Sequence, residues 1–174
     1  MAKVSLTKLG LKVNQDIKTI EFNEQIIEVK QYLPIEHKLE LIGNVINLSA
    51  DANNFSNPVK LDLFLMLEIL YFYTNINFTE KQKEDPAKLY DLVVSSGLMK
   101  LVLQAISEEE YNILENGLFE VVDSIYNYKN SMLGIMENIV ADYGDTKMDA
   151  DTIIQTLEKE ENLALLKDIV TKLG

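Results

Sequence analysis

A single histidine beside a carboxylate is the first candidate for chemistry in this sequence. His37 follows Glu36, and a histidine oriented by a carboxylate can act as a general base or as a metal ligand. The sequence holds no cysteine and no second histidine, so neither a thiolate nucleophile nor a further nitrogen ligand accompanies the pair. We therefore expect His37 to be an ordinary residue on a helix surface, without a catalytic role.

Four aspartates near the C-terminal end form the second candidate, a site for a hard cation. Asp142, Asp145, Asp149 and Asp151 surround Gly144, and calcium prefers several oxygen ligands from a tight loop. The spacing departs from an EF-hand, because the sixth loop position is not glycine and the closing glutamate is missing. We expect helix caps and solvated side chains here, and we predict no metal site.

Aromatic residues cluster at Tyr71, Phe72, Tyr73 and Phe78, where stacking of nucleic-acid bases is one use and a buried core is the other. A site that stacks bases usually has cationic groups for the phosphates, and this acidic sequence contains no arginine. We therefore expect these aromatic residues to lie in the core. No Gly-x-Gly-x-x-Gly or Walker lysine motif is present, and no set of acid, base and nucleophile can be assembled. We predict a non-enzymatic protein that needs no cofactor.

The size and composition of the chain favour one globular domain. A chain of 174 residues suits a single hydrophobic core, and its 47% apolar content is too high for a disordered chain. The most apolar stretch, residues 59–73, is shorter than a membrane span and carries three charges. The absence of cysteine fits a reducing compartment, and the first residues lack the apolar run of a signal peptide. We expect one domain over residues 1–174, in the cytoplasm, without a membrane span.

The charge is strongly acidic and unevenly distributed. The chain has 28 acidic residues against 16 basic residues, all of them lysine, for a net charge of −12. Residues 1–38 are nearly neutral, so the acidity lies in residues 39–174. Arginine guanidinium groups commonly bind the phosphates of nucleic acids, and this negatively charged chain has none. We therefore do not expect it to bind nucleic acid directly. We expect a protein partner with a basic or neutral surface, and we place its contact on an acidic helical surface formed by Glu108, Glu109, Glu110, Glu115 and Glu120.

The N-terminal segment, residues 1–33, is expected to contain a β-hairpin. Apolar and polar residues alternate between residues 17 and 32, on both sides of the polar segment 23–25. Ile20, Phe22, Ile27 and Val29 would share one face of the hairpin. An isolated hairpin is only marginally stable, so we expect this face to pack on helices.

Residues 34–174 are expected to form an acidic helical body. Proline starts two helices, over residues 34–49 and 58–73, and the second has Asn57 as its N-cap. The helix at 61–73 is apolar almost all round, which predicts the centre of the fold. Thr79 and Gln82 form a possible capping box, Asp85 and Pro86 open a helix that ends near Gly97, and residues 98–106 form another.

The last part of the chain continues the helical pattern. Ser107 and Glu110 fit a capping box, and apolar periodicity then runs to Gly144 as one long helix or two, with weak points at Gly117, Gly134 and residues 127–131. Two short helices are expected within residues 149–174. The predicted fold is mostly α in an α+β arrangement, with about six helices around the central one and a small N-terminal hairpin.

Several segments resemble a family of small proteins from phages and prophages of Gram-positive bacteria. They are KLGLK at residues 8–12, KTIEF at 18–22, IEVKQYLPIE at 27–36 and ENLALLKDIVTKLG at 161–174. The resemblance covers the whole chain and its motifs are those of a fold, so it carries over no functional residue.

Two functions fit this resemblance. The first is inhibition of a host defence nuclease, as by anti-CRISPR proteins, with the acidic surface competing with nucleic acid; the charge favours it. The alternative is a tail assembly chaperone that binds the tape-measure or tail-tube protein through an apolar groove. The oligomeric state is left open by the sequence.

Overall fold

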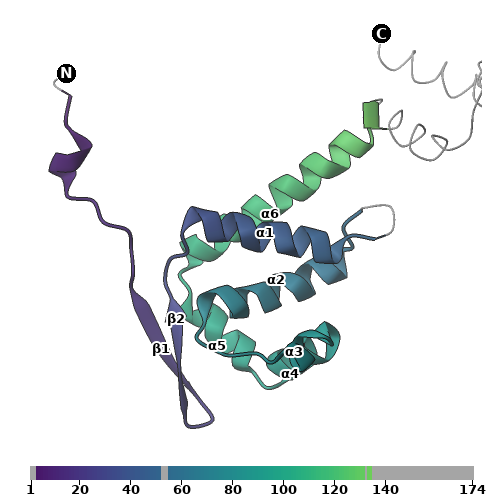
Figure 1. The fold of residues 1–174 in the computed structure, drawn as a ribbon, viewed down its shortest axis with the longest axis horizontal. Coiled ribbons are helices and arrows are strands. Elements are labelled where there is room, and N and C mark those ends of the chain that lie inside the picture. Colours follow the sequence, from purple (N-terminus) through teal and green to yellow (C-terminus); the bar gives the residue numbers. More distant parts are fainter. Residues whose placement is uncertain (1–2, 52–54, 132, 135–174) are drawn as a thin grey trace, which may run out of the picture. The chain divides into compact units, whose positions relative to one another are not determined.

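The computed structural model describes residues 3–51, 55–131 and 133–134. Residue contacts divide the chain into two compact units, residues 1–124 and 125–174, and each is described by itself. The first unit contains the hairpin and nearly all the described helices (Figure 1). Of the second unit, the described part comprises the end of one helix and the residues up to 134.

The predicted hairpin is confirmed. Strand β1 (Ile17–Phe22) pairs antiparallel with β2 (Gln25–Lys30), and Ile20 lies opposite Ile27. Asn23 and Glu24 form a two-residue turn with φ values of 50° and 63°, the left-handed conformation of a type I′ turn. Ile27 and Val29 are buried while their neighbours in the strand are exposed, because alternate side chains point to opposite faces.

The hairpin is attached to the helices by backbone and lysine contacts. Val29 forms a bridge with Thr74, and the Glu28 amide donates to the Asn75 side-chain oxygen at 3.1 Å. Lys30 Nζ donates to the Phe72 carbonyl at 2.9 Å, and Lys18 Nζ to the Gln104 carbonyl at 3.3 Å. These contacts confirm that the hairpin packs on helices, as its marginal intrinsic stability requires.

Two long helices form the centre of the first unit. Helix α1 (Ile35–Ser49) begins after Pro34, and α2 (Pro58–Tyr73) begins at a proline whose N-cap, Asn57, accepts hydrogen bonds from the next two free amides. Helix α2 packs on α1 and also contacts two later helices, so its predicted central position is confirmed. Its fully buried side chains include Leu67, Ile69, Leu70 and Tyr73.

Four further helices follow in the described part of the chain. They are α3 (Glu80–Lys83), α4 (Pro86–Ser95), α5 (Leu98–Ala105) and α6 (Glu108–Lys129). The Thr79–Gln82 capping box is present, Asp85 caps α4, and Gly97 joins α4 to α5 with a φ of 82° that favours glycine. Figure 1 shows α2 between α1 and the layer that contains α4 and α5. The mostly helical α+β fold class is thus confirmed.

The long periodic pattern after residue 107 forms helix α6, which ends at Lys129. This end lies within residues 127–131, where the sequence predicted a weak point in the helix. Gly117 does not interrupt α6; a Cβ at this position would lie 3.2 Å from Ile42 Cδ1 of α1. The predicted continuation to Gly144, the aspartates at 142, 145, 149 and 151, and the two short helices within 149–174 lie outside the described residues.

Candidate functional site

The Glu110 carboxylate lies inside the first unit, at the start of α6. It accepts three hydrogen bonds, from the Leu33 amide and the Tyr73 hydroxyl at Oε1 (both 2.8 Å) and from Lys38 Nζ at Oε2 (2.7 Å). Glu110 and Lys38 are only 4% and 5% exposed. The surface position predicted for Glu110 is therefore wrong, because three segments of the chain enclose its carboxylate.

The polar groups around Glu110 form a hydrogen-bonded cluster with a structural role. The Lys38 ammonium also lies 4.6 Å from the centre of the Tyr32 ring, which adds a cation–π contact. Burial, followed by the hydrogen bond to Glu110, raises the pKa of the Tyr73 hydroxyl far above its ordinary value, so Tyr73 stays a donor. Among the described residues no buried side-chain nitrogen or oxygen is left without a partner, as expected of a structural network.

The capping box predicted at the start of α6 is half formed. Ser107 Oγ accepts from the Glu110 amide at 3.2 Å, as an N-cap serine should. The Glu110 side chain does not return this contact, because its oxygens are occupied by Lys38, Tyr73 and Leu33. The sequence spacing identified the helix start correctly but assigned the carboxylate to the wrong partner.

The other residues of the expected contact zone lie at or near the surface of α6. Glu108, Glu109 and Glu120 are exposed, and Glu115 is half-buried and accepts from the Tyr111 hydroxyl at 3.5 Å. Two large apolar side chains, Ile113 and Phe119, are about half exposed within the same stretch. The acidic surface of α6 is therefore sparser, and more apolar, than the sequence suggested.

The other residues that the sequence offered as candidate sites have structural roles. His37 is exposed on α1, as predicted, and its ring lies 6.0 Å from that of Phe72 in a tilted arrangement. Tyr71 and Phe78 form an edge-to-face pair at 4.9 Å against the core, and Tyr73 is fully buried. The core interpretation of the aromatic cluster is thereby confirmed. The described residues contain no group of three or more histidine, aspartate or glutamate side chains placed to share a metal ion.

A second buried carboxylate, Glu68 on α2, is 5% exposed and accepts a hydrogen bond from Asn44 at 2.9 Å. Burial raises the pKa of this carboxyl above its usual value; the Asn44 hydrogen bond opposes the rise, and the Glu40 charge adds to it. Glu68 has no nucleophile or second proton carrier in hydrogen-bonding distance among the described contacts. Glu68 is therefore a buried carboxylate of the α1–α2 interface whose hydrogen bond to Asn44 offsets part of the cost of burial.

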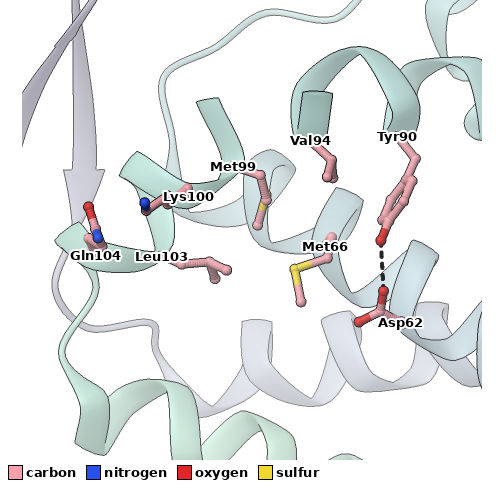
Figure 2. A pocket seen from close by; sticks show the side chains of 8 residues that line it. All are labelled: Asp62, Met66, Tyr90, Val94, Met99, Lys100, Leu103 and Gln104. Atoms are coloured by element: carbon pink, nitrogen blue, oxygen red, sulfur yellow. Dashed lines mark hydrogen bonds between the residues drawn. The ribbon is translucent and has the colours of Figure 1, made fainter. Parts of the chain in front are cut away.

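An open groove of about 480 Å³ lies between α2, α4 and α5 (Figure 2). Its apolar lining consists of Met66, Val94, Met99 and Leu103, and Figure 2 shows these side chains converging between the three helices. Val94 is 43% exposed and Met99 only 3%, so Val94 lies at the solvent-accessible edge of the groove and Met99 lies in its floor. The volume lies in the range of pockets that bind small ligands.

The two ends of the groove are polar. At one end the Tyr90 hydroxyl donates to Asp62 Oδ2 at 2.8 Å, and Figure 2 shows Lys100 and Gln104 at the other end. The hydrogen bond to Asp62, followed by burial, raises the pKa of the Tyr90 hydroxyl. The groove has an apolar floor with a carboxylate at one end and an ammonium at the other. It therefore suits a ligand that is apolar in the middle and polar at its ends. Its lining contains no combination of nucleophile, acid and base that could catalyse a reaction.

The groove was not predicted from the sequence, although the spacing of residues on each of the three helices is consistent with it. The lining residues are all i, i+4 pairs, which lie on one face of a helix. The pairs are Asp62 with Met66, Tyr90 with Val94, Met99 with Leu103, and Lys100 with Gln104. What the sequence does not contain is the packing of the three helices that brings these pairs together.

The chain matches no protein-family model, no curated protein and no solved structure. Among the described residues, no helix has both the length and the apolar character needed to cross a bilayer.

Proposed function

We propose that this chain is a non-catalytic protein-binding protein of the tail assembly chaperone type, which acts in the cytoplasm of a phage-infected bacterium. It holds an apolar segment of the tape-measure or tail-tube protein in the groove between α2, α4 and α5. The observation that carries this proposal is the open apolar groove itself, formed by Met66, Val94, Met99 and Leu103. The phage context comes from the sequence resemblance alone.

The lining of the groove supports protein binding more than small-molecule chemistry. Two of its four apolar side chains are methionines, whose flexible thioethers adapt to differently shaped partners. A chaperone recognises a segment before that segment reaches its final packing, and adaptable apolar contacts suit this task. The polar ends, with Asp62 and Lys100, would orient the bound segment.

The test is an affinity experiment with matched variants on one helix. Val94 and Leu92 are both exposed apolar residues of α4, but only Val94 lines the groove. Tagged wild type, Val94→Lys and Leu92→Lys are used to capture proteins from a phage-infected Gram-positive host, with identification by mass spectrometry. We expect wild type and Leu92→Lys to recover tape-measure or tail-tube protein. Val94→Lys should recover at least about tenfold less, because a bound apolar segment would cover the new ammonium and remove it from water.

Equal recovery of the tail protein by Val94→Lys and Leu92→Lys would remove the groove from the proposal. Circular dichroism of each variant establishes that the helical fold is retained. Recovery of a nuclease in place of a tail protein would contradict the chaperone assignment.

Inhibition of a host defence nuclease is the second candidate, and the exposed carboxylates of Glu108, Glu109 and Glu120 favour it. Together with the net charge of −12, they present negative charge to a basic surface. The burial of Glu110 weakens this candidate, because it removes one of the five expected carboxylates. The triple variant Glu108→Gln, Glu109→Gln and Glu120→Gln tests it: an inhibitor loses its partner, and a groove-binding chaperone keeps it.

A further inference from the structure

The N-terminal arm, residues 3–16, exposes an unusual amount of apolar surface. Every residue from position 3 to position 19 is exposed. The exposed fraction lies between 55% and 70% for the five apolar side chains Val4, Leu6, Leu9, Leu11 and Val13. Scattered exposed apolar residues are common on proteins, but five within ten residues of one arm make a surface suited to a partner.

The arm is also basic, whereas the helical body is acidic. Lys3, Lys8 and Lys12 are its charged residues before Asp16, and Leu9 and Leu11 lie between two of these lysines. The first 38 residues are nearly neutral as a whole, so the excess of acidic residues lies in residues 39–174. The arm and the body therefore attract each other electrostatically.

The groove between α2, α4 and α5 is a possible binding site for the arm. It has an apolar floor of Met66, Met99 and Leu103, with the Asp62 carboxylate, held by Tyr90, at one end and Lys100 at the other. No residue of the arm lines the groove of its own chain, and the arm side chains remain exposed. Both surfaces are thus open in one copy and complementary between two copies.

We propose that two copies of this chain associate by placing the N-terminal arm of each in the α2/α4/α5 groove of the other. Leu9 and Leu11 fill the apolar floor, and a neighbouring lysine lies at the Asp62 end. A reciprocal exchange uses the same contact twice and closes a two-fold dimer. This inference rests on the proposed function for the groove as a protein-binding surface, but it needs no client, and a client would displace the arm.

The first test is the mass of the full-length protein in solution, measured by sedimentation as concentration rises. We expect wild type to dimerise reversibly. Leu9→Gln with Leu11→Gln, and separately Val94→Lys, should weaken dimerisation at least about a hundredfold, because two leucines leave the apolar floor or a charge enters it. The matched controls are Ile35→Gln with Leu39→Gln on α1 and Leu92→Lys on α4, which alter exposed apolar residues outside the arm and the groove. Both controls should dimerise as wild type does.

The second test mixes the two defective proteins. The arm variant retains an intact groove and the Val94→Lys variant retains an intact arm, so a labelled sample of one should bind the other although neither binds itself. A monomeric wild type, an arm variant that still dimerises, or a mixture that fails to associate would each overturn the inference. Client capture separates it from the proposed function, because the arm variant should still bind a tail protein and Val94→Lys should not.

Discussion

At the scale of single residues, the Glu110 carboxylate joins three segments of the first unit. It receives hydrogen bonds from the loop before α1, from α1 itself and from the end of α2, through Leu33, Lys38 and Tyr73. Each donor is buried, so removal of the carboxylate leaves three buried donors without their acceptor. Glu109, the neighbouring residue, is exposed and makes a natural control.

We therefore expect Glu110→Ala to lower the free energy of unfolding by about 3–5 kcal/mol, the usual cost of removing one partner of a buried ion pair. Tyr73→Phe should cost about 1–2 kcal/mol, because it removes a single hydrogen bond from the same carboxylate. Glu109→Ala should stay within about 0.5 kcal/mol of wild type. Urea unfolding followed by circular dichroism measures all three. Similar values for Glu110→Ala and Glu109→Ala would contradict the assigned cluster.

Glu68 predicts a dependence of stability on pH. Because burial raises its pKa in the folded state, the unfolded chain releases this proton at a lower pH than the folded chain does. The folded state thus loses stability as pH rises above the ordinary value of 4.5, and the loss persists at neutral pH. Glu68→Gln keeps an acceptor for Asn44 without the charge, so it should stabilise the protein at pH 7. That gain should disappear below the ordinary carboxyl pKa.

Urea unfolding of wild type and Glu68→Gln at pH 7.5 and at acidic pH tests this sign, at low protein concentration because the isoelectric point is near 4.5. A gain that is the same at both pH values would mean that ionisation of Glu68 is not its cause.

At the scale of elements, the sequence predicted most of the described fold, because its signals are local. Alternation of apolar residues identified the hairpin, and proline with Asn57 or Asp85 identified the starts of α2 and α4. The partner of Glu110 and the groove escaped prediction for one physical reason. Both depend on contacts between residues far apart in the chain, such as Leu33 with Glu110, which neither spacing nor propensity encodes.

The turn of the hairpin provides a prediction at this scale. Glu24 adopts a φ of 63°, a left-handed conformation that costs a residue with a side chain about 1–2 kcal/mol. Glu24→Gly creates the Asn-Gly pair that type I′ turns prefer, so it should raise the free energy of unfolding by about 0.5–1 kcal/mol after the entropy cost of glycine. Glu24→Val should destabilise the protein. Thermal unfolding checks both, and a less stable Glu24→Gly would contradict the assigned turn.

At the scale of the whole molecule, charge and apolar surface point to different partners. The net charge of −12 suggested a mimic of nucleic acid, whereas the N-terminal arm and the groove present apolar side chains to a partner. Screening by salt weakens contacts between exposed charges, but it leaves apolar contacts largely intact. The two functions therefore differ in their response to salt.

A client held in the groove should remain bound when salt is raised from about 0.05 to 0.5 M, with its affinity changing by less than about threefold. An inhibitor that uses its carboxylates should lose most of its affinity over the same range. Binding of the captured partner, measured by calorimetry at several salt concentrations, distinguishes the two. A steep loss of affinity would favour the inhibitor.

The central claim is that the groove between α2, α4 and α5 holds a segment of a phage tail protein, and site-specific photocrosslinking tests it most directly. A photoreactive amino acid at position 94 lies in the groove, and the same group at position 92 lies outside it on the same helix. In phage-infected cells, we predict crosslinks from position 94 to an apolar segment of a tape-measure or tail-tube protein, and few from position 92. Equal crosslinking from both positions, or crosslinks from position 94 to a nuclease, would contradict the claim.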